Sequence, residues 1–294
     1  MGIVFVGIPF YTLAKYEGMA EAVSSLRAAG ILDRLRSVDP SLLDLGDIAC
    51  PKISQDQGPN NLHNLESFIE GTKRVKETLL QGADASKLMF CLGGECAFIV
   101  GSLAALRTKL KGKPGIVWMD AHGDFNTPET SPEGFIGGMP LAFACGRGPK
   151  LSPDIEAARP LLSEKQVVHV GSRSLDPGED KSLLSSVKVF SAKDVQKNGA
   201  RSVARQTADY LTGSCDWIVA HLDADVLDPS IMPAADFPEP GGLTGNHVLE
   251  IFHALHETGK LKAVNLTAYN PRKDTRKIGR KLLLELAPRL VASS

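Results

Sequence analysis

The sequence predicts an α/β protein built on a mostly parallel sheet that is buried on both faces. Short runs rich in valine and isoleucine, without polar alternation, recur along the chain, and amphipathic stretches with helical periodicity separate them. Apolar strands joined through helices are typical of parallel sheets covered by helices on both sides. The pattern amounts to about eight βα units. A closed (β/α)₈ barrel has the same unit count, so it is the competing architecture.

Eight apolar runs are the expected strands, at residues 3–8, 43–45, 88–92, 115–119, 167–170, 187–190, 217–222 and 263–267. The expected helices are residues 17–29, 61–80, 98–110, 192–211, 244–258 and 273–291. Gly30 marks the end of the first helix, because glycine is common just beyond a helix C-terminus. Two turn-rich stretches, 126–138 and 229–242, are long enough to be active-site loops.

No repeat or linker divides the 294 residues, so the sequence predicts a single domain over 1–294. The net charge of −1 argues against nucleic acid or an anionic membrane as a partner. No apolar run approaches the roughly 20 residues that span a bilayer, and no signal peptide is apparent. Five irregularly spaced cysteines argue against a disulfide framework. These features favour the cytoplasm.

Ionisable side chains follow the expected strands at the point where each strand ends. Asp120, His122 and Asp124 come directly after residues 115–119, and Asp223 and Asp225 follow 217–222. Alternate residues of an extended segment face the same way, so each group can converge on one point. Five oxygen and nitrogen donors suit Mn²⁺, Mg²⁺ or Zn²⁺, and the excess of carboxylates favours Mn²⁺. Four carboxylates carry more charge than one divalent ion needs, which favours two ions.

Each of these residues also has a simpler interpretation. A lone aspartate at a strand end is more often the N-cap of a helix than a metal ligand. His221, which precedes the aspartate pair, is better interpreted as a core histidine or one that contacts a ligand. It is the two groups taken together that predict a metal centre.

With these motifs, the chain resembles the arginase or ureohydrolase family, which includes arginases, agmatinases and formiminoglutamases. The resemblance covers nearly the whole chain and keeps the family's order. Its motifs are GIPF at 7–10, LRAAG at 26–30, GGEC at 93–96, WMDAHGDFNTP at 118–128, VGSRSLDPGE at 170–179, HLDADVLDPSIMPA at 221–234, PGGLT at 240–244 and YNP at 269–271.

The resemblance implies a three-layer α/β/α sandwich with an eight-stranded parallel sheet and a pair of divalent metal ions. It implies that Asp120 and Asp223 bridge the ions, that His122 and Asp225 complete one site, and that Asp124 belongs to the other. On this basis Asp124 and His122 are expected to be catalytic as well as metal-binding. The implied substrate-binding residues are Asn126, Ser131, Glu133, Asp176 and Glu179. The resemblance further implies a homo-oligomer, trimeric or hexameric.

Four positions depart from the family pattern. Cys96 stands where the family has a metal-binding histidine, and a thiolate there would shift preference from Mn²⁺ towards Zn²⁺ or Fe²⁺; the alternative is a small buried apolar residue. Ala268 replaces a glutamate that binds the substrate guanidinium, and Gly137 replaces a histidine assigned to proton transfer. Glu133 replaces a hydroxyl residue that contacts the α-carboxylate of arginine.

The resulting prediction is a binuclear-metal hydrolase of a C–N bond in a guanidino or linear amidine small molecule other than L-arginine. An N-hydroxyguanidine or formimino compound would offset the departures, because its leaving group is better or its charge altered. The alternative is a catalytically weakened or inactive arginase-like protein with a regulatory or assembly role. It rests on Cys96, Gly137 and Ala268 occurring together.

Overall fold

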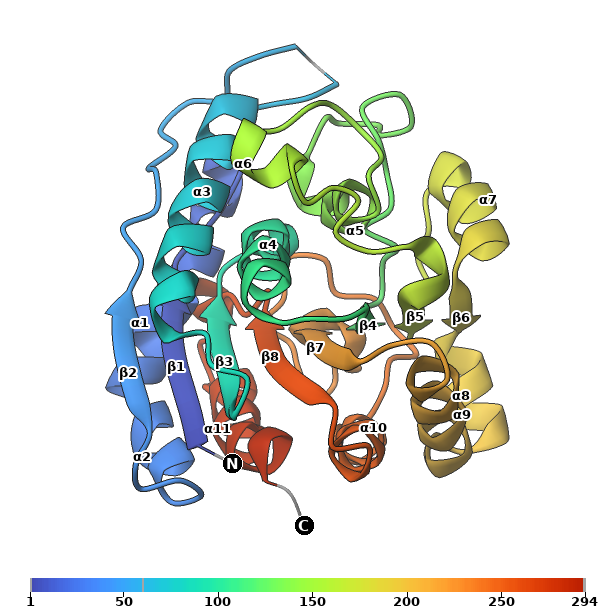
Figure 1. The fold of residues 1–294 in the computed structure, drawn as a ribbon. Helices are drawn as coiled ribbons and strands as arrows, with labels where there is room; N and C mark the ends of the chain where they lie inside the picture. Colours follow the sequence, from blue (N-terminus) through green and yellow to red (C-terminus); the bar gives the residue numbers. More distant parts are fainter. Residues whose placement is uncertain (1, 60, 293–294) are drawn as a thin grey trace.

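The computed structural model describes residues 2–59 and 61–292, and its centre is one eight-stranded parallel sheet (Figure 1). The strands lie in the order β2-β1-β3-β8-β7-β4-β5-β6. Their bounds are β1 Gly2–Ile8, β2 Leu43–Asp47, β3 Lys87–Gly93, β4 Pro114–Met119, β5 Val167–Val170, β6 Lys188–Phe190, β7 Trp217–Asp223 and β8 Leu261–Thr267. All eight expected strands are confirmed. The barrel alternative is wrong, because the sheet is open with β2 and β6 at its two edges.

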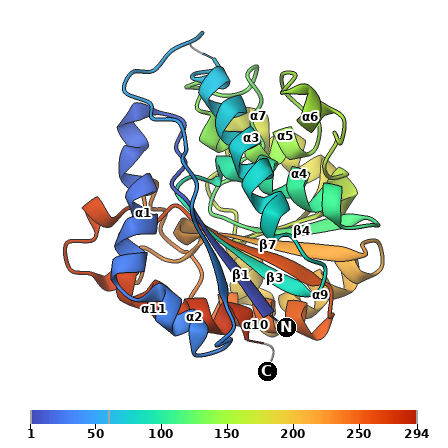
Figure 2. The ribbon, with the colours of Figure 1, turned by 60° about the vertical axis from the view of Figure 1, so that its left-hand side comes forward.

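Helices cover both faces of the sheet, which makes the three-layer α/β/α sandwich (Figures 1 and 2). One layer contains α1 Glu17–Ala28, α2 Ile31–Arg36, α8 Ala192–Asn198, α9 Ala200–Thr212, α10 Gly245–Glu257 and α11 Ile278–Val291. The opposite layer contains α3 Leu65–Gly82, α4 Ile99–Lys109, α5 Pro140–Ala144, α6 Pro153–Glu156 and α7 Pro177–Ser186. No helix in the described ranges is long and apolar enough to cross a membrane.

The helices differ from the sequence prediction in where they begin and end, and in one case a glycine divides a helix in two. The single helix expected over 192–211 is two helices, because Gly199 has φ +83° between α8 and α9. Gly30, at φ +89°, ends α1 as expected, but α2 begins directly after it. The helices expected over 61–80 and 273–291 begin later, at Leu65 and Ile278. The short helices α2, α5, α6 and α7 lack the long apolar period on which the prediction depended.

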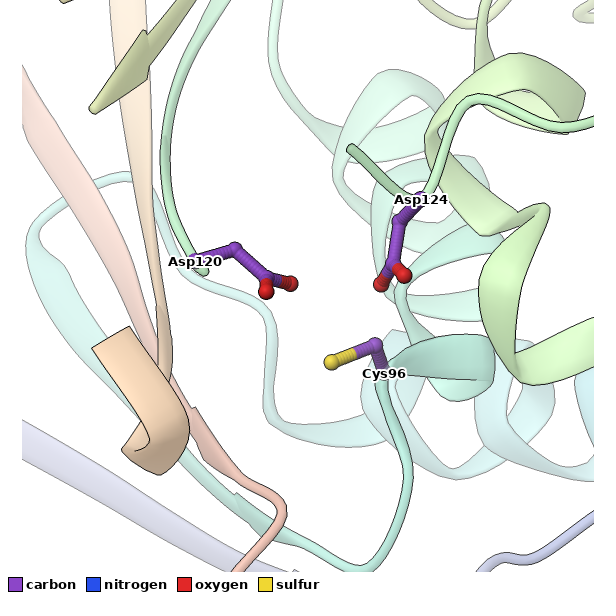
Figure 3. Close-up of side chains that lie close together, drawn as sticks. All are labelled: Cys96, Asp120 and Asp124. Carbon is purple, nitrogen blue, oxygen red and sulfur yellow. The ribbon is translucent and has the colours of Figure 1, made fainter. Parts of the chain in front are cut away.

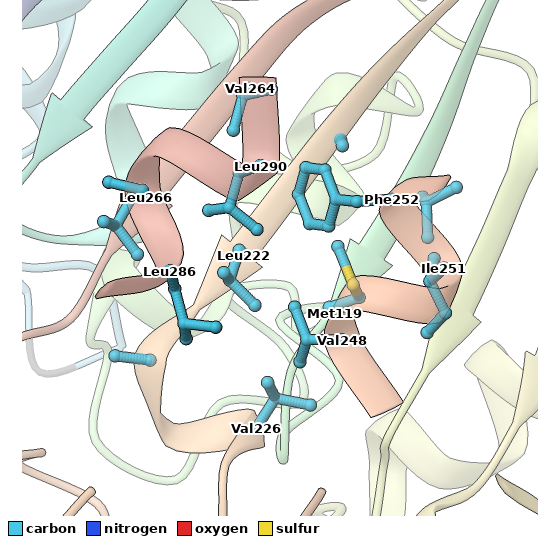
Figure 4. Packing of buried hydrophobic residues seen from close by; sticks show 14 of the residues in the cluster. Met119, Leu222, Val226, Val248, Ile251, Phe252, Val264, Leu266, Leu286 and Leu290 are labelled. Atoms are coloured by element: carbon cyan, nitrogen blue, oxygen red, sulfur yellow. The ribbon is translucent and has the colours of Figure 1, made fainter. Parts of the chain in front are cut away.

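A dense apolar core fixes the central strands against α10 and α11 (Figure 4). Met119 of β4 and Leu222 of β7 pack there with Phe252 of α10, and all three are fully buried. Burying a side chain of this size contributes about 1.5–3 kcal/mol. Side chains alternate along a strand, so the residues that follow Met119 and Leu222 point to the opposite layer. Those residues are Asp120 and Asp223.

Candidate metal centre and substrate cavity

The predicted ligands follow three of the four central strands at the carboxyl edge of the sheet. Cys96 begins the 3₁₀ turn η2 (Cys96–Phe98) after β3, Asp120 follows β4, and Asp223 ends β7. The strands β3, β8, β7 and β4 are adjacent in the sheet. The chain order reverses here, since β7 and β8 are inserted between β3 and β4. Ligands of open parallel sheets bind at such a point.

The ligand atoms form two sets that share one carboxylate. Cys96, Asp120 and Asp124 place one donor atom each within 4.8 Å of one another, and Figure 3 shows the three side chains pointing into one space. Asp120, His122 and Asp225 form the second set at the same spacing. Because Asp120 belongs to both sets, the geometry is consistent with its expected bridging position.

Asp223 joins the two sets through direct contacts. The Cys96 thiol donates to its Oδ2 at 3.0 Å, and the Asp225 backbone N–H donates to its Oδ1 at 2.7 Å. His122 Nδ1 lies 3.1 Å from Asp225 Oδ2 and 3.5 Å from Asp120 Oδ1. The structure therefore brings all six predicted ligands into one cluster.

Hydrogen bonds from nearby residues in the chain, together with the local backbone conformation, hold these carboxylates in place. The Trp118 indole donates to Asp120 Oδ2 at 3.0 Å, and the His122 backbone N–H donates to Asp120 Oδ1 at 2.7 Å. Asp124 has φ +49°, in the left-handed region that residues other than glycine seldom adopt. Backbone strain of this kind costs about 1–3 kcal/mol and is concentrated at functional sites. The turn places the Asp124 carboxylate opposite that of Asp120.

The carboxylates are too crowded and too buried to be ionised together without a cation. Burial and the neighbouring carboxylates raise the pKa of Asp124 and of Asp223 well above the usual value. Burial opposes protonation of His122, but Asp225 and Asp120 outweigh it and raise the His122 pKa to about 12. Divalent ions relieve this repulsion, because they favour ionised oxygen ligands. The donor set therefore fits two divalent ions.

Cys96 has the chemistry of a thiol that needs a metal to become an anion. Burial, followed by the charge of Asp223, raises the Cys96 pKa well above its usual value. His221 Nε2 lies 3.1 Å from Cys96 Sγ, and the Thr267 hydroxyl lies 3.2 Å from it. The His221 ring stacks on Trp118, with centroids 3.8 Å apart. His221 therefore lies behind Cys96 and outside both ligand sets, as a buried residue that contacts a ligand.

A cavity of about 250 Å³ opens above the cluster, and both predicted loops contribute to it. All five expected substrate-binding residues line it; they are Asn126, Ser131, Glu133, Asp176 and Glu179. Gly137 and Ala268, two of the positions that depart from the family pattern, also line the cavity. The lining residues that the sequence prediction missed include Tyr16, Glu95, Phe135, Asp236 and Phe237. Only the length of the loop 229–242 pointed to the last two.

Several of these residues also brace the loops that carry the site. Asp176 and Glu179 form the capping box at the start of α7. Asn126 Nδ2 donates to Asp176 Oδ2 at 2.8 Å, and the Phe125 backbone N–H donates to Glu179 Oε1 at 2.7 Å. Burial raises the Glu179 pKa to about 7. The α7 N-terminus is thus tied to the loop that follows β4.

Glu95 is a second buried carboxylate in the cavity wall. Thr12 donates its backbone N–H to Glu95 Oε1 at 2.8 Å and its hydroxyl to Oε2 at 2.7 Å. Burial raises the Glu95 pKa to about 8. The nearby backbone of Ala268 donates to the Gly94 carbonyl at 2.7 Å, which joins the β8 end to the β3 end. Glu95 therefore holds the backbone and side chain of Thr12, and it also faces the cavity.

The protein is therefore a three-layer α/β/α protein with a buried carboxylate cluster at the point where the order of its central strands reverses. The family model of the arginase family matches residues 1–292. Arginase of Bacillus subtilis (strain 168) is 32% identical over 292 residues, which are 98% of this chain and 97% of the relative. The native structure of arginase from Bacillus caldovelox at pH 5.6 aligns with a TM-score of 0.93 and 31% identity, over 100% of this chain and 99% of that one. The formimidoylglutamase of Bacillus subtilis shares the fold at a TM-score of 0.76 and 17% identity, over 98% of this chain and 85% of that one. The chain belongs to the arginase family.

Proposed function

We propose that this protein is a binuclear-metal hydrolase that cleaves a C–N bond in a guanidino or linear amidine small molecule. The observation that carries the proposal is the pair of ligand sets that share Asp120 beneath a cavity. Six buried or half-buried donors at this spacing are unfavourable to folding unless they bind cations. A chain freed from metal binding has no physical need to keep them together.

The residues that would hold the ions are the six of the cluster, namely Cys96, Asp120, His122, Asp124, Asp223 and Asp225. When bound, two divalent ions supply a water whose pKa is lowered to about 7 and polarise the reacting group. The carboxylate majority favours Mn²⁺, whereas the Cys96 thiol adds affinity for Zn²⁺ or Fe²⁺. Asp124 belongs to one ligand set and His122 to the other, and each would hold one ion beside Asp120.

The cavity supports a small cationic substrate. A volume of about 250 Å³ suits a small molecule rather than a polymer. Among the described lining residues nine are Asp or Glu and none is Lys or Arg. Four of the nine would hold the ions, and Glu133 and Asp236 are paired with lysines. The remaining three, Glu95, Asp176 and Glu179, still favour a guanidinium or amidinium group over an anionic one.

We propose further that L-arginine is not the preferred substrate. Glu133 at the rim would repel an α-carboxylate, and Lys15, the cation beside it, is already paired with Glu133 at 2.9 Å. Ala268 offers no carboxylate to the guanidinium. The curated relatives are named arginases, which makes L-arginine the first compound to compare.

A catalytically weakened protein is the second candidate, and Gly137 with Ala268 favours it. Neither side chain can move a proton or accept a hydrogen bond. A missing general acid slows loss of a poor amine leaving group by about 10²–10⁴-fold. Substrates with better leaving groups would separate this candidate from an inactive protein.

The test is metal content together with product release. The full chain, purified without chelator, should contain close to two metal ions per chain by mass spectrometry. After loading with Mn²⁺, Zn²⁺ or Fe²⁺, it should release urea or an amine from members of a panel containing L-arginine, agmatine, methylguanidine, an N-hydroxyguanidine and a formimino compound. Fewer than one metal per chain and no release from the panel would overturn the proposal. We also propose that the protein is a trimer or hexamer, which light scattering on the same sample would test. We propose that it is located in the cytoplasm, which fractionation of the source cells would test.

A further inference from the structure

Three aromatic rings from distant parts of the chain meet at the mouth of the cavity. Tyr16 ends the 3₁₀ turn η1 (Ala14–Tyr16), Phe135 lies in the loop after β4, and Phe237 lies in the loop that follows β7. The Tyr16 ring centroid is 4.8 Å from that of Phe135 and 5.0 Å from that of Phe237, and the two phenylalanine rings are 5.9 Å apart. All three residues line the cavity. We call them the aromatic wall.

The aromatic wall stands directly beside the metal centre. The edge of the His122 ring faces Phe237, with centroids 5.8 Å apart. Phe237 is 36% exposed, which is high for a large apolar side chain in this protein. The aromatic wall therefore presents apolar surface to any molecule in the cavity. This surface lies next to His122, so one small molecule can contact both.

The position of Phe135 depends on the glycine at 137. A Cβ on Gly137 would lie 2.1 Å from Phe135 Cζ, which is far inside any real contact. The ring thus fills the space in which residue 137 would carry a side chain. The absence of a side chain at residue 137 is therefore what leaves room for the Phe135 ring at the mouth of the cavity.

The charges around the aromatic wall disfavour an anionic tail. Lys15 lies 4.9 Å from the Tyr16 ring centroid, but its ammonium group is already paired with Glu133. Lys273 is paired in the same way with Asp236 at 2.7 Å. A substrate tail against the wall therefore meets aromatic carbon and compensated charge. A carboxylate placed there would lie beside Glu133 and Asp236 and would compete with them for the two lysines.

From this arrangement we infer the substrate class. The substrate is a guanidino or amidino compound whose tail carries no carboxylate and is apolar or aromatic, with its cationic head over the carboxylate cluster and its tail on the aromatic wall. The inference rests on the proposed function of the same site. Aromatic rings attract both other rings and alkyl groups by contact and by burial of apolar surface.

The experiment uses the metal-loaded full chain and four compounds. They are methylguanidine, which has no tail; 2-phenylethylguanidine, which has an aromatic tail; agmatine, which has a charged amine tail; and L-arginine. We expect kcat/KM for 2-phenylethylguanidine to exceed that for methylguanidine and for L-arginine by at least about tenfold, mainly through a lower KM. Such a factor corresponds to about 1.4 kcal/mol.

Variants assign the preference to the aromatic wall. Phe237→Ala should lower the ratio of kcat/KM for 2-phenylethylguanidine to that for methylguanidine by about tenfold. Phe135→Leu, which keeps an apolar side chain over Gly137, should lower the same ratio by a smaller factor. Tyr210→Ala is the matched control, because Tyr210 is an aromatic residue of similar exposure on α9, outside the cavity. It should leave both values unchanged.

The outcomes separate this inference from the proposed function. Equal or greater kcat/KM for L-arginine, or an unchanged ratio in Phe237→Ala, would overturn the inference while leaving the hydrolase intact. If the metal-loaded protein hydrolyses none of the four, the N-hydroxyguanidine, the formimino compound and the metal content decide the proposed function, and calorimetric binding decides the inference. Tighter binding of 2-phenylethylguanidine than of methylguanidine, lost in Phe237→Ala, would support it; equal binding or none would refute it.

Discussion

Cys96 and His221 are in direct contact, with the thiol sulfur 3.1 Å from Nε2 of the imidazole. Burial lowers the His221 pKa to about 3, so the ring is neutral. The same ring stacks on Trp118, whose indole holds Asp120. A continuous set of contacts thus joins the unusual ligand of the first set to the carboxylate shared by both. Cys96 is therefore part of the cluster, and the neutral imidazole of His221 beside it can accept or donate a hydrogen bond.

This contact leads to a prediction for Cys96→Ser. A hydroxyl is a harder and weaker ligand than a thiolate, so we expect Zn²⁺ affinity of the set Cys96, Asp120 and Asp124 to fall by about 10–100-fold, with a smaller loss for Mn²⁺. Competition titration with a metal indicator measures both. Cys50→Ser is the control, since Cys50 is a free thiol away from the cavity. Equal losses for the two metals would contradict thiolate ligation.

The convergence of the candidate ligands was predictable, because a simple rule governs where their side chains lie. Asp120, His122 and Asp124 alternate after an apolar strand, and parallel strands end at one edge of the sheet. The surroundings of Cys96 were not predictable in this way, because Thr267 and His221 approach it from strands far away in the sequence. Family resemblance had assigned Cys96 a place in the cluster, but only the fold shows what lies behind it.

Replacing one carboxylate should have opposite effects with and without metal. Asp124→Asn removes a buried carboxyl group, whose pKa is raised by burial and by Asp120 and Asp223. Without metal at pH 8, we expect the free energy of unfolding to rise by about 1–3 kcal/mol. With excess metal, the stabilisation that the parent chain gains, about 2.7 kcal/mol at 100 times Kd, should be reduced or lost.

Urea unfolding with chelator and with Mn²⁺ measures both effects of the Asp124 substitution. Asp209→Asn, an exposed aspartate on α9, should change neither value by more than about 0.5 kcal/mol. A metal-free Asp124→Asn protein that is less stable than its parent would show that the carboxylate is satisfied by the protein itself.

Two adjacent glycines offer a test of the packing above the cavity. Gly137→Ala should destabilise the protein by about 1–3 kcal/mol, because the new methyl group would overlap the Phe135 ring. Gly138→Ala meets no atom within 4 Å and should be neutral or slightly stabilising. In a Phe135→Ala background the two substitutions should become alike. Thermal unfolding of the five variants measures the coupling, and a Gly137→Ala penalty that persists without the ring would refute it.

The cavity wall was also the part of the fold that the sequence predicted least. The expected helix over 192–211 differs from the structure only by a break at Gly199, which a local glycine preference explains. The contact of Phe135 with Gly137 is of another kind, because no periodic pattern marks a ring that turns back over its own loop. Short helices such as α7, defined by the Asp176 and Glu179 caps, were missed for a related reason. Their side chains had been interpreted only as substrate contacts.

The final prediction concerns pH. Burial raises the pKa of Glu95 to about 8 and of Glu179 to about 7, from an ordinary value of 4.5. Both groups therefore bind protons more tightly in the folded protein than in the unfolded chain. The stability that this contributes is fully present below pH 4.5 and is lost as the pH rises through 7 and 8. In the presence of chelator, these two groups should lower the free energy of unfolding by about 6 kcal/mol between pH 5 and 9, with the larger part from Glu95. Glu95→Gln keeps an acceptor for the Thr12 backbone N–H, and its amide NH2 can donate to the Thr12 hydroxyl in place of accepting from it. It should remove a large part of this slope, whereas Glu285→Gln on the exposed face of α11 should leave it unchanged. Urea titrations at intervals of one pH unit measure the slope. A Glu95→Gln protein with the parent's pH profile would mean that Glu95 is ionised in the folded state at neutral pH, and that the cavity wall is more polar than its burial indicates.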